Sequence, residues 1–266
     1  MHANLAARTD SFPFADPAFC RRVWAALRKN WPRPLAACLM GNHLHLLVAG
    51  DPDDERRRLA TVLGQMHGPR FRCVGSASEG RLKLRRDVRY VVLNPCRAQL
   101  AKDPLEWLWS THRDLVGATL EDWVDREAVL ALERGWDPLE SAHRYISGDP
   151  YVAVESTPLP LPAEPAAVSR WPLQALINAA TAAGRGHPVT ERGASRTMLF
   201  QLARDHGWTG ASNLARLTRC ERSAVYRAWK AEDIAAPARL CLGDARLRTM
   251  RQPSEPRHKV WRNSRP

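Results

Sequence analysis

The sequence predicts a mixed α/β (α+β) protein of two domains, and three observations support this fold class. Helical and strand patterns alternate in the first half of the chain. The proline-rich residues 150–162 then block both helix and central strand, because proline fixes φ and lacks an amide donor. Strand patterns disappear beyond that segment. We expect an α/β domain, a linker, an all-α domain and a disordered basic tail, over residues 1–149, 150–169, 170–243 and 244–266 respectively.

The first domain starts with a helical pattern over residues 17–29, followed by an apolar run over residues 35–48. That run predicts a strand pair or one long strand. Residues 55–66 predict an amphipathic helix, with Arg56 to Arg58 turned to solvent. Four apolar side chains share one face of this helix: Leu59, Val62, Leu63 and Met66.

The second domain shows four helical patterns, over residues 171–183, 191–206, 211–218 and 221–231. The last two are joined by a tight turn, which is the layout of a helix-turn-helix. Four apolar side chains would pack between these two helices: Ala215, Leu217, Val225 and Trp229. Four others on the second helix would reach base edges and phosphates of duplex DNA: Arg222, Ser223, Tyr226 and Arg227. An ordinary helical hairpin is the alternative.

The composition indicates an acidic partner and excludes a membrane protein. The 266 residues include 40 Lys and Arg against 28 Asp and Glu, so the formal net charge is +12. This excess favours a nucleic acid as partner. No run approaches the roughly 20 apolar residues of a membrane-spanning helix. The first residues lack the layout of a signal peptide, so we expect a cytoplasmic protein whose six scattered cysteines stay free and buried.

Two histidines in the apolar run are candidate metal ligands. In a strand, His43 and His45 point to the same face, while Leu44 and Leu46 face the core. Two adjacent imidazoles can hold a divalent cation and leave further coordination positions for substrate oxygens. Two structural histidines are the alternative, because this spacing is a short pattern.

A tyrosine segment, residues 87–98, is the second candidate. Read as a helix, it places Tyr90 and Asn94 on one face at i and i+4, and Pro95 is expected to end it. Read as a strand, it also places both on one face. A core tyrosine and a helix-capping asparagine are the alternative interpretation.

These segments and a third one resemble a known family. Residues 41–47 (GNHLHLL), 89–98 (RYVVLNPCRA) and 103–113 (DPLEWLWSTHR) are similar, in this order, to the motifs of the HUH single-tyrosine transposases, which include the REP-associated tyrosine transposases. The resemblance covers roughly residues 1–120. It implies a small antiparallel-sheet nuclease domain with helices, in a bacterial, nucleoid-associated protein.

The resemblance also implies a reaction. Tyr90 would attack a phosphodiester of single-stranded DNA, giving a 5′-phosphotyrosine and a free 3′-hydroxyl without a nucleotide cofactor. His43 and His45 would hold Mg²⁺ or Mn²⁺, with Asn94 as the third ligand. Arg89 and Arg97 would contact DNA. The expected partners are single-stranded or hairpin DNA, duplex DNA through the second domain, and a second copy of the chain in a homodimer.

Three departures from the family pattern qualify this resemblance. The segment before residue 12 is short, so one sheet edge is expected to be either abbreviated or contributed by residues 3–9 alone. Residues 73–84 are short and rich in Gly and Ser where relatives carry a longer excursion with another strand. His112 stands where relatives have tyrosine, and His67, His112 or an acidic residue could replace Asn94 as the third ligand. A non-catalytic DNA-binding regulator and a replication initiator with the same chemistry remain alternatives.

Overall fold

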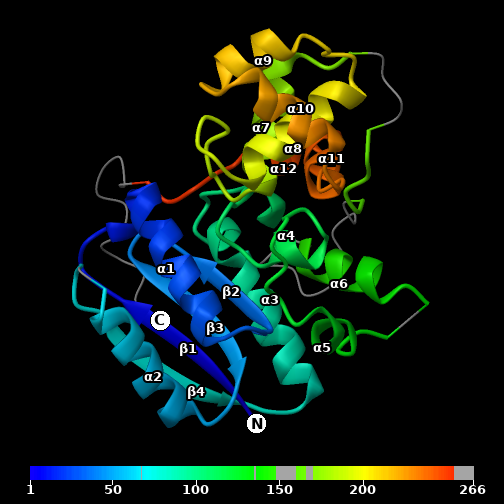
Figure 1. The fold of residues 1–266 in the computed structure, drawn as a ribbon. Helices are drawn as coiled ribbons and strands as arrows, with labels where there is room; N and C mark the ends of the chain where they lie inside the picture. Colours follow the sequence, from blue (N-terminus) through cyan, green and yellow to red (C-terminus); the bar gives the residue numbers. More distant parts are fainter. Residues whose placement is uncertain (67, 135, 148–159, 166–169, 255–266) are drawn as a thin grey trace.

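The computed structural model describes residues 1–66, 68–134, 136–147, 160–165 and 170–254. These residues form a mixed α/β structure with a four-stranded antiparallel sheet, twelve α-helices and two short 3₁₀ turns. The sheet and its helices lie at one end of the molecule and a cluster of helices lies at the other (Figure 1). The predicted fold class is therefore confirmed at the level of a mixed α/β protein.

The sheet has the order β2-β3-β1-β4 and every neighbouring pair is antiparallel. Its strands are β1 (His2–Arg8), β2 (Ala36–Leu39), β3 (His43–Ala49) and β4 (Arg72–Ser78). Residues 35–48 thus form a strand pair. β1 covers nearly the expected residues, but the expectation of an edge strand was wrong, because β1 pairs on both sides. The Gly- and Ser-rich stretch, although short, contains most of strand β4. β1 is central because Ala3, Leu5 and Ala7, all fully buried, fill the core side of the sheet.

Helices cover both faces of the sheet. Figure 1 shows α1 (Pro17–Asn30) and α2 (Pro52–Gly64) on one face and α3 (Arg81–Arg97) on the other. Asp16 and Asp51 cap the first two helices by accepting hydrogen bonds from main-chain amides of the first turn. On α2 the predicted apolar face is buried at Leu59, Val62 and Leu63. Helix α3 therefore lies over the face of β3 that carries His43 and His45.

The remaining elements follow in two groups. The turns η1 (Pro13–Ala15) and η2 (Pro104–Glu106) and the helices α4 (His112–Leu115), α5 (Arg126–Leu130) and α6 (Pro138–Ser147) belong to the first half of the chain. The second half contains α7 (Leu173–Ala183), α8 (Ala194–Asp205), α9 (Ala211–Leu217), α10 (Arg222–Lys230), α11 (Ala236–Gly243) and α12 (Ala245–Arg248). The four helices expected between residues 171 and 231 are all present.

Buried side chains from the two halves of the chain pack against each other. The hydrophobic core of the helical half includes Leu105, Val116 and Ala118 from the first half. At the same junction, Arg185 forms a buried ion pair with Asp114. The Arg185 guanidinium also donates to the carbonyl of Leu108 at 2.8 Å. Charged and apolar contacts therefore tie the helical half to the segment that follows α3.

The C-terminal segment folds back onto the first half, so the prediction of a disordered tail is wrong for residues 244–254. Leu247 of α12 is fully buried. Its carbonyl accepts a 2.5 Å hydrogen bond from Arg113, whose pKa burial lowers to about 10. Main-chain bonds join Leu108 N to Arg251 O at 2.8 Å and Arg251 N to Glu106 O at 2.7 Å. Residues 255–266 lie outside the described part.

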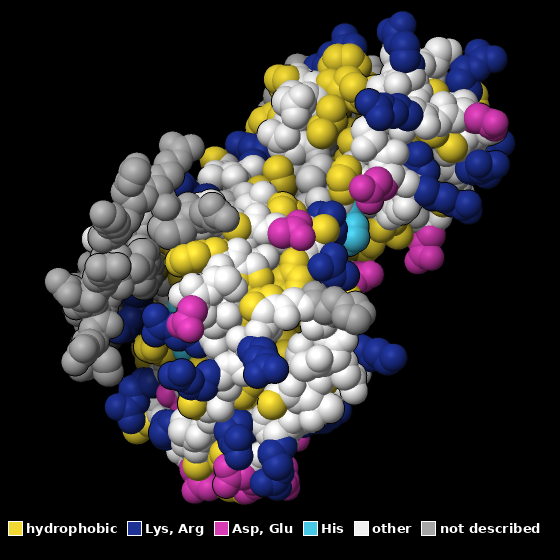
Figure 2. Space-filling model, turned by 90° about the vertical axis from the view of Figure 1, so that its left-hand side faces the viewer, with side chains coloured by type: hydrophobic (Ala, Val, Ile, Leu, Met, Phe, Trp, Pro, Cys, Tyr) yellow, Lys and Arg dark blue, Asp and Glu magenta, His cyan; other side chains and the backbone are white. Residues whose placement is uncertain are grey.

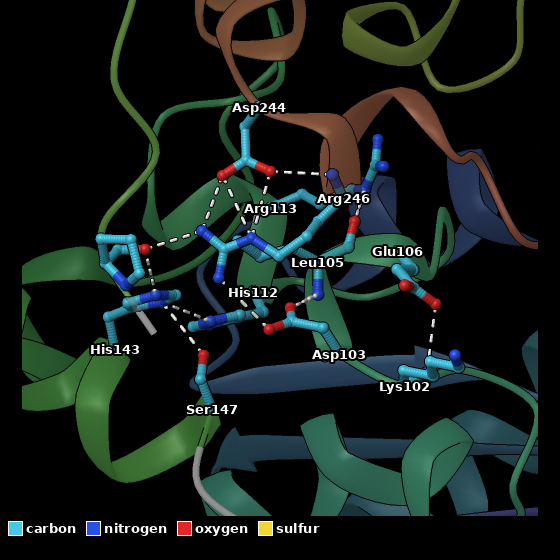
Figure 3. A network of polar contacts seen from close by, with 11 residues as sticks. Lys102, Asp103, Leu105, Glu106, His112, Arg113, His143, Ser147, Asp244 and Arg246 are labelled. Carbon is cyan, nitrogen blue, oxygen red and sulfur yellow. Dashed lines mark hydrogen bonds and ion pairs between the residues drawn. The ribbon is translucent and has the colours of Figure 1, made fainter. Parts of the chain in front are cut away.

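Acidic partners explain why this basic segment is ordered. Arg246 pairs with Asp244 at 2.6 Å and with Asp103 at 3.3 Å (Figure 3). Arg246 also donates to the carbonyl of Pro160 at 2.6 Å. Most of the predicted linker lies outside the described residues, but Leu161 in residues 160–165 packs on the helical core. The charge pattern of the tail is thus matched by carboxylates of the first half.

Two expectations from composition can also be compared with the structure. In the described residues, no helix combines the length and apolar character needed to cross a membrane. The six cysteines are free, as expected. Four of them are buried, whereas Cys73 and Cys220 are only partly buried.

The buried ion pair leads to a stability prediction. We expect Arg185→Ala to lower the free energy of unfolding by about 3–5 kcal/mol, because the Asp114 carboxylate would stay buried without its partner. Arg33→Ala is the control, since Arg33 pairs with Asp125 while its own side chain is 63% exposed. That variant should lose less than about 1 kcal/mol. Urea denaturation measures both, and equal losses would contradict the interpretation.

Candidate functional site

Strand β3 places the two candidate metal ligands side by side. Leu44 and Leu46 are fully buried on the core face, so His43 and His45 both point to the opposite face. Their ring centroids are 5.3 Å apart and the rings are nearly perpendicular. The alternation of side chains along a strand predicts this shared face.

Helix α3 brings Tyr90 to the same place. The ring centroids of His45 and Tyr90 are 5.6 Å apart, with an interplanar angle of 89°. Tyr90 is 41% exposed, so its side chain is accessible from the solvent. The structure therefore gathers His43, His45 and Tyr90, which the sequence places on two separate elements.

Both imidazoles are held in the uncharged form. Burial, and then the charge of Arg8, lowers the pKa of His43 to about 4. Burial, and then His43, lowers the pKa of His45 to about 3. The ring nitrogen Nδ1 of His43 lies 2.8 Å from Oδ1 of Asn42, which accepts a hydrogen bond from the Nδ1–H group and leaves the lone pair on Nε2. Two neutral imidazoles with free lone pairs are suitable metal ligands at neutral pH.

Asn42 belongs to the candidate site, although it was not among the candidate residues from the sequence. Its Oδ1 orients the His43 ring and fixes which ring nitrogen carries the proton. The only signal in the sequence is its position directly before the first histidine, inside the motif of residues 41–47. That position alone does not reveal where the amide points.

Asn94 has a local role in α3. Its Nδ2 donates to the carbonyl of Tyr90 at 3.0 Å and to that of Val91 at 3.3 Å. The Val91 carbonyl is the one that residue 95 would bond in a regular helix, and Pro95 has no amide hydrogen. Asn94 replaces this donor, which explains why the helix runs on to Arg97 instead of ending at the proline as predicted. The Oδ1 atom is the one available as a ligand.

A basic cavity of about 450 Å³ lies along α3 beside Tyr90. Arg89 and Arg97, both predicted to contact DNA, line it, together with Lys83 and Arg86. The Arg97 guanidinium carbon is 5.1 Å from the centroid of the Tyr90 ring. The excess of positive charge around the exposed tyrosine suits a phosphate backbone.

The cavity also contains Tyr145, which comes from α6 and was not predicted. The Arg85 guanidinium carbon lies 3.5 Å from the centroid of its ring. Arg85 is itself held by two hydrogen bonds to Glu133, at 2.7 and 2.8 Å. A single aromatic residue in a helical pattern carries no motif, so only the fold reveals that Tyr145 faces the same cavity as Tyr90.

The other candidates for a third metal ligand are His112, His67 and an acidic residue, and none of them is found beside His43 and His45 in the described residues. His112 is buried and stacks on His143, with a 3.0 Å contact between Nε2 and Nδ1 (Figure 3). His67 lies outside the described residues. Among the residues that are described, no group of three or more His, Cys, Asp and Glu side chains could hold a metal ion. A cation at His43 and His45 would therefore depend on other oxygen donors.

Helices α9 and α10 pack together and present basic side chains. Arg222, Ser223, Tyr226 and Arg227 are exposed, as the helix-turn-helix interpretation requires. Leu217 was expected between the helices but is 39% exposed, because the buried positions of α9 are Ala211, Leu214 and Ala215, followed by the buried C-cap residue Thr218. Lys and Arg side chains are spread over both ends of the molecule (Figure 2).

Comparisons of the chain with family models, with curated proteins and with solved structures give no match.

The paired roles of Asn94 and Pro95 can be tested with a double-mutant cycle. Asn94→Ala should lower the free energy of unfolding by about 1–2 kcal/mol, because the Val91 carbonyl loses its donor. In a Pro95→Ala background the same substitution should cost about 1 kcal/mol less, since residue 95 then supplies a main-chain N–H. Chemical denaturation of the four proteins gives the coupling. Equal costs in both backgrounds would exclude this role for Asn94.

Proposed function

We propose that this protein is a metal-dependent DNA strand transferase of the HUH single-tyrosine kind, acting on single-stranded or hairpin DNA. The observation that carries the proposal is the approach of the exposed Tyr90 to the neutral pair His43 and His45, across two elements of the fold. A nucleophile beside two metal-ligand side chains, in a basic cavity, is the arrangement that phosphodiester cleavage through tyrosine requires.

The donor set fits part of a coordination sphere. His43 and His45 supply two imidazole nitrogens, and Asn42 sets the tautomer of the first. Asn94 Oδ1 and substrate phosphate oxygens are the proposed remaining donors for Mg²⁺ or Mn²⁺. A cation held there would polarise the scissile phosphate and offset the negative charge that builds on its oxygens.

In this proposal the strand is cleaved and rejoined through Tyr90. The Tyr90 oxygen attacks phosphorus and loses its proton to water, while the bond from phosphorus to the 3′-oxygen breaks. The 3′-oxygen takes a proton and leaves as a hydroxyl, and the 5′-phosphate stays on Tyr90. Attack by a 3′-hydroxyl on this phosphotyrosine reverses the sequence, so the bond energy is retained and no nucleotide cofactor is consumed.

The rest of the molecule supplies binding surface in this proposal. Arg89 and Arg97 would contact the backbone of the strand beside Tyr90. The exposed side chains of α10 would contact duplex DNA, and the homodimer expected from the resemblance would bring two such sites together. Tyr145 offers an aromatic face on which an unpaired base can stack.

The covalent step is tested with a denaturing-gel assay. The full chain is incubated with labelled single-stranded hairpin oligonucleotides and Mn²⁺. We expect a labelled protein band that a chelator abolishes and that is weaker by at least about a thousandfold in Tyr90→Phe, because phenylalanine has no nucleophilic oxygen.

Tyr145→Phe is the matched control, since Tyr145 lines the same cavity and keeps its ring after substitution. It should retain the adduct. If no oligonucleotide forms an adduct while the protein still binds DNA, the non-catalytic regulator takes the place of the transferase. If Tyr145→Phe loses the adduct and Tyr90→Phe keeps it, the nucleophile is misassigned.

The role of α10 is tested by duplex binding at several salt concentrations. Replacing Arg222 and Arg227 with Ala should weaken binding and lower the slope of log K against log salt by about 1 for each phosphate that the protein no longer neutralises. Arg33→Ala, an exposed cation of the first half, should leave the slope unchanged. Fluorescence anisotropy measures both, and an unchanged slope in the double variant would contradict the proposal.

A further inference from the structure

A second cavity, of about 300 Å³, lies between α1 and the segment that joins α7 to α8. Arg21 and Trp24 of α1 line one side of it, and Gly184, Arg192 and Ser195 line the other. None of these residues belongs to the site around Tyr90. The cavity thus joins the two halves of the molecule at a place that the proposed function does not use.

Three buried polar atoms on the cavity-lining residues have no partner within the described part of the chain. They are Trp24 Nε1, Trp109 Nε1 and Ser195 Oγ, and each of the three residues is at most 3% exposed. An indole nitrogen can only donate, and a serine hydroxyl can donate as well. An unpaired buried donor costs free energy, and a ligand rich in hydrogen-bond acceptors would reduce this cost. These donors therefore favour such a ligand in the cavity.

The space around Ser195 depends on Gly184. A Cβ atom added to Gly184 would lie 1.9 Å from Ser195 Oγ. Both residues line the cavity. The absence of a side chain at residue 184 therefore leaves room for the hydroxyl at the cavity wall.

The charges around the cavity favour an anion. Its four arginines outnumber its two glutamates, and one of these, Glu121, already pairs with Arg28. Arg21 and Arg192 make no ion pair with any described residue. Burial, and then the neighbouring Arg185, lowers the pKa of Arg28, so like charges are crowded at this wall.

The amino end of α8 adds main-chain donors. This helix has 12 residues, and its first turn lies at the cavity through Ala194 and Ser195. Gly193, the capping residue, offers no side chain to accept from the first amides. Uncapped amides and the positive end of a helix bind phosphate groups.

From these observations we propose that the cavity binds a small phosphate monoester. The phosphate would meet Arg21, Arg192, Ser195 and the amides of α8, and the attached organic group would contact the apolar wall formed by Trp24 and Leu120. A volume of about 300 Å³ is at the lower end of small-molecule sites, which suits a compact ligand. A free metabolite and the 5′-phosphate end of a DNA strand are the two sources of this chemistry.

The test is calorimetric titration of the full chain at constant ionic strength. The probes are inorganic phosphate, a nucleoside 5′-monophosphate, and one oligonucleotide with either a 5′-phosphate or a 5′-hydroxyl. Saturable binding of the monophosphate indicates a free ligand, and a preference for the phosphorylated oligonucleotide indicates a DNA end. Both results support the site, and the absence of saturable binding by every phosphate probe overturns it.

Variants locate the binding. Arg21→Gln should weaken phosphate binding about tenfold or more, because it removes a charged donor. Arg22→Gln is the control, since the neighbouring Arg22 is exposed and outside the cavity. Ser195→Ala should weaken binding without lowering the unfolding midpoint, because the hydroxyl has no partner to lose. Equal effects of the two arginine variants would overturn the proposal. Tyr90→Phe should bind the probes normally, which separates this site from the proposed reaction.

Discussion

The arrangement of the molecule depends on charges buried where its two halves meet. Asp114 is fully buried and Arg185 nearly so, and each neutralises the other. Arg113 is also fully buried, and its guanidinium donates hydrogen bonds to the carbonyls of Leu105 and Leu247. Loss of the contacts between the halves would take Arg185 from Asp114 and the Leu247 carbonyl from Arg113, and a buried charge that loses its partner is strongly destabilising. The helical half is therefore held on the sheet-bearing half, and the cavity lined by Arg185 lies at this junction.

The candidate site depends on the side-chain periodicity of strand β3 and of helix α3, which face each other at one side of the sheet. Along β3 the period of two turns both imidazoles away from the core, and pairing with β1 over seven positions fixes this register. A slip by one residue would turn Leu44 and Leu46 outward and bury the histidines. On the other side, α3 presents Tyr90 from a helix that crosses a proline without losing its hydrogen bonding, because Asn94 supplies the missing donor.

Local patterns predicted the strand pair of residues 35–48 and the four helices between residues 171 and 231. They also singled out His43, His45 and Tyr90, which the structure brings together. The shared face of His43 and His45 follows from strand alternation, and the position of Tyr90 follows from the helical interpretation of its segment. Other features depend on contacts between distant segments. The central place of β1 requires the sheet order, which no local pattern contains. Strand β4 is mostly exposed and so lacks the alternation that marks a strand. Tyr145 and the phosphate cavity involve segments joined only by the fold, and the tail is ordered because Asp103 and Glu106 match its arginines.

The return of α12 to the first half also affects how the chain is made. Arg246 bonds to Asp103, 143 residues earlier in the sequence, and Arg251 bonds to Glu106, 145 residues earlier. Synthesis proceeds at about 5–20 residues per second, so these partners emerge from the ribosome many seconds apart. During that interval the Arg113 guanidinium lacks one of its acceptors, and the first half cannot complete its packing. Contacts of such long range also slow folding. The packing of the first half is therefore complete only after the last helix has left the ribosome.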